Sequence, residues 1–129
     1  MVGIVIVSHS RNAAEGAREI AAQMAPEVSI AAAGGTADGR LGTDINSILK
    51  AIREVYTDDG VLIIFDLGSA YMNAEMAVEM LDEDMRKRVE ISDAAMVEGA
   101  AIAAVNSGLS KPLSEIMKEL KHCRISKMP

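Results

Sequence analysis

Aromatic residues are scarce in this sequence, which has one phenylalanine, two tyrosines and no tryptophan among 129 residues. Alanine, with 20 residues, and methionine, with 9, supply much of the 50% hydrophobic content. Small alanine side chains let helices and strands approach closely, and flexible methionine side chains fill irregular gaps. We therefore expect a closely packed aliphatic core that includes the methionines. The length is typical of one domain, so residues 1–129 are expected to form a single domain.

Cysteine and long apolar runs are almost absent as well. The only cysteine, Cys123, has no partner for an intrachain disulfide, which fits a reducing compartment. Residues 2–7 are apolar, but they are too few for a secretory signal and follow no basic leader. No stretch approaches the roughly 18 apolar residues of a membrane span. We therefore expect a cytoplasmic protein without a membrane segment.

Basic residues are fewer than acidic ones, 13 against 19, which gives a formal net charge of −6. Lysine and arginine form no run, whereas a face that binds nucleic acid needs clustered basic side chains. Nucleic acid is therefore not an expected partner. A metal site is not expected either, because His9 and His122 lie far apart in the chain and Cys123 has no second thiol at a zinc-ligand spacing.

Apolar runs rich in β-branched residues alternate with segments of helical periodicity. The expected strands are residues 3–7, 28–32, 61–65 and 88–91. The first and third are apolar throughout, as is typical of strands that are buried on both faces of a parallel sheet. The alternation predicts an α/β fold: a three-layer sandwich with a mainly parallel open sheet of about four strands, order 2-1-3-4, and helices on both faces.

Helices are expected between and after these strands. Residues that favour helix starts mark their beginnings: Asn12 with Glu15 as a capping box, Thr43 or Asp44, Ser69, Ser92 or Asp93, and Pro112. Two polar segments have simpler interpretations. The charged run of residues 79–88 is expected to be a solvated face, and the tail of residues 126–129 is expected to be frayed.

Polar residues with chemical potential follow the first and third strands. In open α/β sheets, sites form beyond the carboxyl ends of the strands where the strand order reverses, here between these two strands. The first ends in Ser8-His9-Ser10 and the third in Asp66, so we expect His9 and Asp66 to meet. A carboxylate that holds one ring nitrogen of a histidine leaves the other free as a nucleophile. A satisfied polar role for His9 and a helix-capping role for Asp66 remain open from the residues alone.

Other chemistries fit this position poorly. A receiver domain needs acidic metal ligands after the first strand, where Ser-His-Ser stands. A dinucleotide or P-loop site needs glycines there, but Arg11, Asn12 and Ala13 follow. Neither Ser8 nor Ser10 has the glycine pattern of a hydrolase nucleophile elbow.

Several motifs, spread over nearly the whole chain, together resemble one family. They are Val5-Ile-Val-Ser-His-Ser10, Gly42-Thr-Asp44, Phe65-Asp-Leu-Gly-Ser-Ala70 with Asn73-Ala-Glu75, and Met96-Val-Glu-Gly99. This set is similar to the phosphotransfer subunits of phosphoenolpyruvate-dependent dihydroxyacetone kinases, which belong with the mannose-class enzyme IIA domains of the sugar phosphotransferase system. Residues 67–73 depart from the Gly-Gly-Ser-Pro-Phe-Asn-like pattern of the sugar-transporting branch, which favours the kinase branch.

The resemblance implies a phosphoryl relay. The histidine phosphocarrier protein would phosphorylate His9, with phosphohistidine as the covalent intermediate and no cofactor bound by this chain. The phosphoryl group would then pass to ADP on a nucleotide-binding kinase subunit, and finally to dihydroxyacetone on a third subunit. Members of the family are commonly homodimers, so a homodimer is expected here.

The resemblance also implies roles for individual residues. Asp66 is expected to orient His9. The residues expected to cradle the phosphate are Ser8, Ser10, Gly68 and Ser69. Partner contacts are expected from Arg11, Gly34, Gly35 and Arg40. The last three lie in a glycine-rich loop, residues 33–42, which ordinary turn formation also explains. Two other functions remain open: a IIA domain of a mannose-class sugar transporter that delivers phosphate to a IIB protein, and a non-catalytic α/β module that binds an anion in the same crevice.

Overall fold

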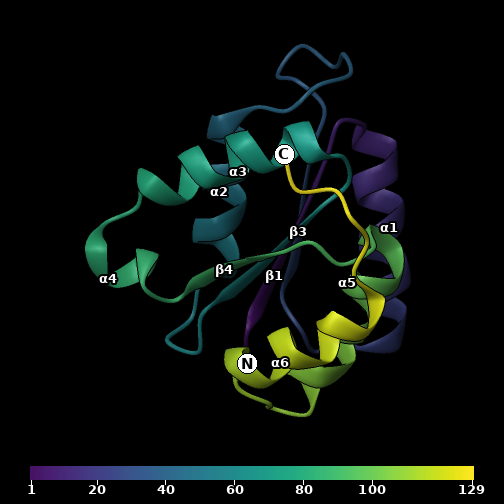
Figure 1. The fold of residues 1–129 in the computed structure, drawn as a ribbon, viewed down its shortest axis with the longest axis vertical. Coiled ribbons are helices and arrows are strands. Elements are labelled where there is room, and N and C mark those ends of the chain that lie inside the picture. The colour runs from purple at the N-terminus through teal and green to yellow at the C-terminus, as the bar shows by residue number, and fades with distance from the viewer.

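A parallel sheet of four strands runs through the centre of the protein (Figure 1). The computed structural model describes residues 1–129, and its strands are β1 (Gly3–Ser8), β2 (Ile30–Gly34), β3 (Val61–Phe65) and β4 (Val89–Ser92). Their order is β2-β1-β3-β4, and all three pairings are parallel. The α/β fold and the strand order predicted from the sequence are therefore confirmed.

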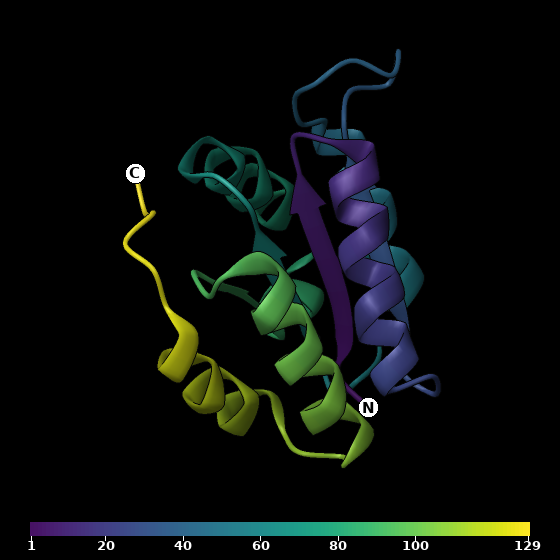
Figure 2. The ribbon, with the colours of Figure 1, turned by 90° about the vertical axis from the view of Figure 1, so that its right-hand side faces the viewer.

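Helices cover both faces of this sheet. They are α1 (Arg11–Met24), α2 (Ile45–Val55), α3 (Gly68–Glu79), α4 (Glu83–Arg86), α5 (Met96–Gly108), α6 (Leu113–Leu120) and the 3-10 helix η1 (Lys121–Cys123). On one face α1, α5 and α6 pack, with α1 and α5 side by side (Figure 2), and on the other face α2 and α3 pack. No helix combines the length and the apolar character that crossing a membrane would require.

The central strand β1 contributes to both cores, because successive side chains of a strand point to opposite faces. Ile4 and Ile6 belong to the core beneath α1 and α5, whereas Val5 and Val7 belong to the core beneath α2 and α3. All four side chains are fully buried. The uninterrupted apolar run in the sequence is thus explained by a strand that is covered on both sides.

Alanine side chains line the inner faces of the helices. In α1 and α3 the buried residues are Ala14, Ala17 and Ala21, and Ala70, Ala74 and Ala77. The methionines of α3 lie on its outer side instead. Met72 and Met76 of α3, and Met80 directly after this helix, are each at least 50% exposed. The expectation that these methionines fill the core is wrong, because the alanines already occupy the positions that face the sheet.

The start of α1 differs from the predicted one. Ser10 caps this helix, because its hydroxyl accepts a hydrogen bond from the backbone N–H of Ala13 at 3.2 Å. The predicted capping box of Asn12 and Glu15 does not form, and Glu15 pairs with Arg18 instead. The physical reason is that β1 ends at Ser8, so the chain turns into the helix at once.

Other boundaries are shifted as well. Asp44, one of the two predicted caps, caps α2. Ser69 lies inside α3, whose preceding residue, Leu67, makes no side-chain capping bond. Ser92 belongs to β4, and its hydroxyl accepts a hydrogen bond from the N–H of Ala94, so α5 begins only at Met96. β2 and β4 begin at residues 30 and 89 rather than 28 and 88.

Two polar segments contain more structure than expected. The charged run includes α4, which is capped by Asp82 through the N–H of Met85 at 2.9 Å. The C-terminal tail is anchored at Lys127, whose ammonium group donates hydrogen bonds to the carbonyl oxygens of Phe65 and Ala94. The expectation of a frayed tail is therefore wrong at Lys127.

Candidate functional site

The candidate site lies where β1 and β3 part at their carboxyl ends. Val7 and Phe65 are paired in the sheet, and the N–H of Asp66 still donates to the carbonyl of Val7 at 3.1 Å. Beyond this point α1 covers one face of the sheet and α3 covers the other. The chain reversals after the two strands therefore bring His9 and Asp66 together.

Asp66 holds His9 at both its ring and its backbone. Carboxylate oxygen Oδ1 lies 3.0 Å from Nδ1 of the His9 ring, and Oδ2 accepts a hydrogen bond from the backbone N–H of His9 at 2.9 Å. The two side chains are partly accessible, with exposed fractions of 26% for His9 and 18% for Asp66. A reagent in solution can therefore reach the ring, while the carboxylate behind it is more enclosed.

Asp66 is surrounded by hydrogen-bond donors. Besides the two bonds from His9, it accepts bonds from the hydroxyl of Ser8 at 2.9 Å and from the N–H of Leu67 at 2.6 Å. Burial raises the pKa of Asp66, but the hydrogen bonds from His9, Leu67 and Ser8 outweigh burial and hold this pKa below its ordinary value. The group is therefore a carboxylate at neutral pH, and it can only accept hydrogen bonds.

Ser69 lies on the opposite side of the His9 ring. Its hydroxyl oxygen is 2.8 Å from Nε2, so the two ring nitrogens face a carboxylate and a hydroxyl. Because the carboxylate of Asp66 accepts only, the neutral ring carries its proton on Nδ1. Nε2 then holds the lone pair and accepts a hydrogen bond from Ser69. If His9 acts as a nucleophile, this arrangement makes Nε2 the reacting nitrogen.

Ser8 and Ser10 support the turn that carries His9. Ser8 is fully buried, and its hydroxyl accepts a hydrogen bond from the N–H of Ser10 at 3.0 Å while donating to Asp66. The Ser10 hydroxyl caps α1. Among the four residues expected to cradle a phosphate, Ser69 alone has its side chain against the His9 ring, and the burial of Ser8 argues against direct contact with an external phosphate.

Gly34, the last residue of β2, and Gly35 directly after it are packed against this turn. A Cβ atom on Gly34 would lie 2.5 Å from the carbonyl oxygen of Ser10, so no larger residue fits there. Gly35 has a φ of +76° and donates its N–H to the carbonyl of Ser8. Farther along, the N–H of Gly42 donates to the carbonyl of His9 at 2.8 Å. The loop of residues 35–42 thus closes over the backbone on either side of His9.

The two arginines expected at partner contacts are both exposed. Arg11 is the first residue of α1 and forms no ion pair. Arg40 forms an ion pair with Asp38 at 2.9 Å, and its side chain is 78% exposed. Their contact with a partner protein stays a prediction.

Comparison with known proteins identifies the family. Residues 3–117 match the family described as PTS system fructose IIA component. The chain belongs to this family. Its fold also recurs in two solved structures. The crystal structure of a protein of unknown function, EF1359, is 40% identical, with a TM-score of 0.84 over 94% of this chain and 93% of that one. A sigma-54 interaction domain protein from Enterococcus faecalis is 16% identical, with a TM-score of 0.71 over 94% of this chain and 88% of that one, and shows the fold alone.

Several relatives of this IIA chain are DhaM subunits of dihydroxyacetone kinases from different bacteria. The phosphoryl donor subunit DhaM of PEP-dependent dihydroxyacetone kinase 2 from Listeria innocua is 40% identical, over 93% of this chain and 97% of that protein. The phosphotransferase subunit DhaM of the PTS-dependent kinase from Lactococcus lactis is 35% identical, over 97% of this chain and 98% of that protein. The DhaM subunit from Escherichia coli is 36% identical, and the match covers 95% of this chain but 27% of that protein.

Sequence reasoning missed one residue beside the site of this IIA chain. The ammonium group of Lys127 lies 4.4 Å from the centre of the Phe65 ring and bonds to the Phe65 carbonyl, which immediately precedes Asp66. Burial lowers the pKa of Lys127, and the negative charges of Asp66 and Asp93 oppose that shift. A lysine in a short polar tail carries no sequence signal for such a position, because the contact depends on long-range packing.

Proposed function

We propose that this chain is the phosphoryl donor subunit of a phosphoenolpyruvate-dependent dihydroxyacetone kinase. It accepts a phosphoryl group from the histidine phosphocarrier protein on Nε2 of His9 and passes it to ADP bound on the nucleotide-binding kinase subunit. The observation that carries the proposal is the alignment of Asp66, His9 and Ser69, in which Nδ1 meets the carboxylate at 3.0 Å and Nε2 meets the hydroxyl at 2.8 Å. The DhaM relatives support the choice of kinase.

The first step is a transfer between two histidines. The lone pair of Nε2 attacks the phosphorus atom of the phosphohistidine on the phosphocarrier protein. The P–N bond of the donor breaks and its electron pair returns to the donor ring, while a new P–N bond forms at His9. The proton on Nδ1 stays on the ring and keeps its hydrogen bond to Asp66, so the carboxylate stabilises the positive charge that the ring acquires.

The second step reverses these roles. An oxygen of the ADP β-phosphate attacks the phosphorus atom on His9, the P–Nε2 bond breaks, and its electrons return to the imidazole. Such transition states are loose, and the protein contributes mainly by positioning the reactants and stabilising charge. Ser69 leaves Nε2 when the phosphoryl group arrives, and its hydroxyl then donates to a phosphoryl oxygen.

The start of α3 provides the electrostatic environment for the phosphoryl group. The first N–H groups of a helix have no partner within the helix, and the positive end of its dipole favours an anion. Gly68 and Ser69 are the first two residues of α3. Because Ser69 contacts His9, a phosphoryl group on Nε2 lies at this helix start. The chain itself needs no metal or organic cofactor for these steps.

Other parts of the proposal concern context. We infer that the chain works in the cytoplasm, as a single domain and as a homodimer. Arg11 and Arg40 are exposed near the turn and the loop that flank His9, and they are proposed to contact partner proteins. A IIA domain of a sugar transporter is the second candidate. It would use the same histidine with a different acceptor, and the name of the matched family favours it.

Reconstitution of the relay tests the proposal. The purified chain is incubated with phosphoenolpyruvate, enzyme I and the histidine phosphocarrier protein, and its labelling is followed. The ADP-loaded kinase subunit with dihydroxyacetone, or a IIB protein, is then supplied as acceptor. Formation of dihydroxyacetone phosphate supports the kinase role. Transfer to the IIB protein alone would support the transporter role, and a chain that takes up no label would be an anion-binding module at most.

A further inference from the structure

We propose that Lys127 is a positioning residue for the phosphoryl acceptor: by holding the end of β3, it fixes the carboxylate of Asp66 that orients His9. This inference rests on the proposed function. Lys127 donates hydrogen bonds to two carbonyl oxygens, those of Phe65 and Ala94, the second at 2.8 Å. Its ammonium group also lies over the Phe65 ring, 4.4 Å from the ring centre. A cation in this position gains from both the carbonyls and the face of the ring.

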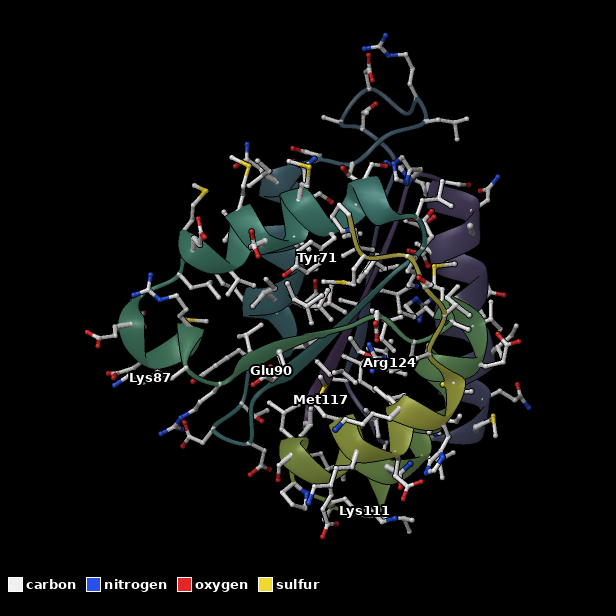
Figure 3. All side chains as sticks on the ribbon, in the orientation of Figure 1. Tyr71, Lys87, Glu90, Lys111, Met117 and Arg124 are labelled. Atoms are coloured by element: carbon white, nitrogen blue, oxygen red, sulfur yellow. The ribbon has the colours of Figure 1, made fainter.

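The segment that carries Lys127 is held in place independently of it. The N–H of Ala95 donates to the carbonyl of Cys123 at 2.9 Å, and Ala94 forms an antiparallel bridge with Arg124. The guanidinium Nε of Arg124 also contacts both carboxylate oxygens of Asp93, at 3.0 and 3.1 Å. The segment crosses in front of the sheet toward the start of α3 (Figures 1 and 3). These contacts place the segment so that Lys127 lies beside the end of β3.

The hydrogen bond to the Phe65 carbonyl restrains the backbone next to Asp66, the residue that orients His9. The Phe65 carbonyl belongs to the peptide group that joins Phe65 to Asp66, so a donor fixed on this oxygen restrains the backbone from which the Asp66 side chain extends. The same ammonium group bonds to the chain that follows β4, at Ala94. One side chain thus connects the ends of two neighbouring strands beside the site.

The tail also touches the other element that contacts His9. A Cβ atom on Gly68 would lie 2.5 Å from the carbonyl oxygen of Lys127, so the tail packs directly against the first residue of α3. The next residue, Ser69, holds Nε2 of His9. The C-terminal segment therefore contacts both the strand that presents Asp66 and the helix that presents Ser69.

The charge of Lys127 has a second effect. The negative charge of Asp66 raises the pKa of Lys127 and opposes the larger lowering effect of burial, so Asp66 favours the cationic form of Lys127. When His9 carries a phosphoryl group, two negatively charged groups, this group and Asp66, lie at opposite nitrogens of one ring. A half-buried cation behind Asp66 offsets part of their repulsion, because such interactions are less screened than on the open surface.

The test compares Lys127→Met with Lys121→Met, a matched control in which an exposed lysine of η1 changes. Methionine keeps an unbranched side chain over Phe65 but removes the N–H donors and the charge. Rapid-quench measurement of His9 phosphorylation should show a rate about ten- to a hundredfold lower for Lys127→Met, the sensitivity expected of a misplaced reactant. The Lys121→Met protein should react like the wild type.

A spectroscopic measurement separates positioning from mere anchoring of the tail. In the unphosphorylated protein, ¹⁵N NMR of the His9 ring should show a smaller population of the Nδ1–H tautomer in Lys127→Met. In Lys121→Met this population should equal that of the wild type. Lys127→Arg, which keeps the cationic donor, should recover most of the lost rate; if Lys127→Met does not fold, Lys127→Gln takes its place with the same expected results. A wild-type rate together with a wild-type ring spectrum would overturn the proposal. If the wild-type chain itself takes up no phosphate, the proposed function fails, while the ring spectrum still tests the role of Lys127.

Discussion

The carboxylate of Asp66 contacts His9 twice, through Nδ1 of the ring at 3.0 Å and through the backbone N–H at 2.9 Å. The second contact fixes the peptide that carries the ring, and the first fixes the rotation of the ring itself. One carboxylate therefore restrains both the position of the His9 peptide and the rotation of the His9 ring. The geometry of the candidate site therefore depends on how the end of β3 is held against the end of β1.

The phosphoryl group is expected on His9 alone. In the relay, the wild-type chain should acquire one acid-labile and base-stable phosphoryl group, because Nε2 is the nucleophile in the proposed step. His9→Ala should acquire none. The matched control is His122→Ala, since His122 is the only other histidine, and it should label normally. Label that survives in His9→Ala would contradict the assignment.

Replacing Asp66 by asparagine should slow phosphoryl transfer without unfolding the protein. Asn keeps the shape of the side chain but removes the charge that stabilises the protonated Nδ1. The rates of phosphorylation and of transfer to the acceptor should both fall, by about ten- to a thousandfold. Rapid-quench kinetics in each direction measure the effect. Unchanged rates would leave Asp66 with a structural role at the start of α3.

Asp66 should also make the stability of the protein depend on pH. Its folded-state pKa lies below the ordinary value of 3.8, so the native state favours the charged form. This contribution is fully present above the unfolded pKa and is lost as pH falls through the folded pKa. The difference in free energy of unfolding between wild type and Asp66→Asn should therefore shrink from about pH 5 toward about pH 2. Denaturant unfolding at several pH values measures it, and a constant difference would contradict the prediction.

Two serines near His9 should give different defects when replaced by alanine, one in the phosphorylation rate and one in stability. Ser69→Ala removes the hydroxyl that contacts Nε2, and phosphorylation should slow by about five- to tenfold, since a neutral hydrogen bond contributes about 1 kcal/mol. Ser10→Ala removes the cap of α1 and should lower the free energy of unfolding by about 1 kcal/mol. Kinetics and thermal unfolding of both variants check this pair. Faster phosphorylation of Ser69→Ala would mean that the hydroxyl only occupies the lone pair in the resting state.

Two glycines should respond in opposite directions to alanine. At Gly34 the new methyl group would meet the Ser10 carbonyl at 2.5 Å, so Gly34→Ala should destabilise the fold by about 1–3 kcal/mol. At Gly16, inside α1, nothing lies within 4 Å of the new group, so Gly16→Ala should stabilise by about 0.5–1 kcal/mol. Denaturant unfolding of both variants measures the difference. A neutral Gly34→Ala would show that the turn before α1 can move.

The sequence predicted the sheet well because its evidence is local. The runs at residues 3–7 and 61–65 are apolar at every position, as is typical of a strand covered on both faces. The meeting of His9 and Asp66 followed from the same reasoning, since both come directly after neighbouring parallel strands. No packing detail was needed for either prediction.

The remaining features depend on choices that local patterns leave open. In α3, Ala74 and Met76 both lie on stripes of helical spacing, and the close approach of the helix to the sheet selects the alanines for the inside. Ser10 and Asn12 are both good capping residues, and the end of β1 decides between them. The role of Lys127 could not be predicted from local patterns at all, because its hydrogen-bond partners precede it by 62 and 33 residues.

The position of the last residues has a practical consequence for protein engineering. The backbone nitrogen of Pro129 lies 4.0 Å from where a Cβ atom of Gly68 would be, at the start of α3, whereas Met1 precedes β1 at the opposite end of the sheet (Figure 1). A bulky label attached to this segment would lie close to the start of α3 and, if His9 is the phosphoryl acceptor of the proposed relay, would obstruct the approach of its partner proteins. The same label on Met1 would disturb only an exposed ion pair with Asp59, which contributes little to stability. A label at Met1 is thus expected to leave the surroundings of His9 undisturbed.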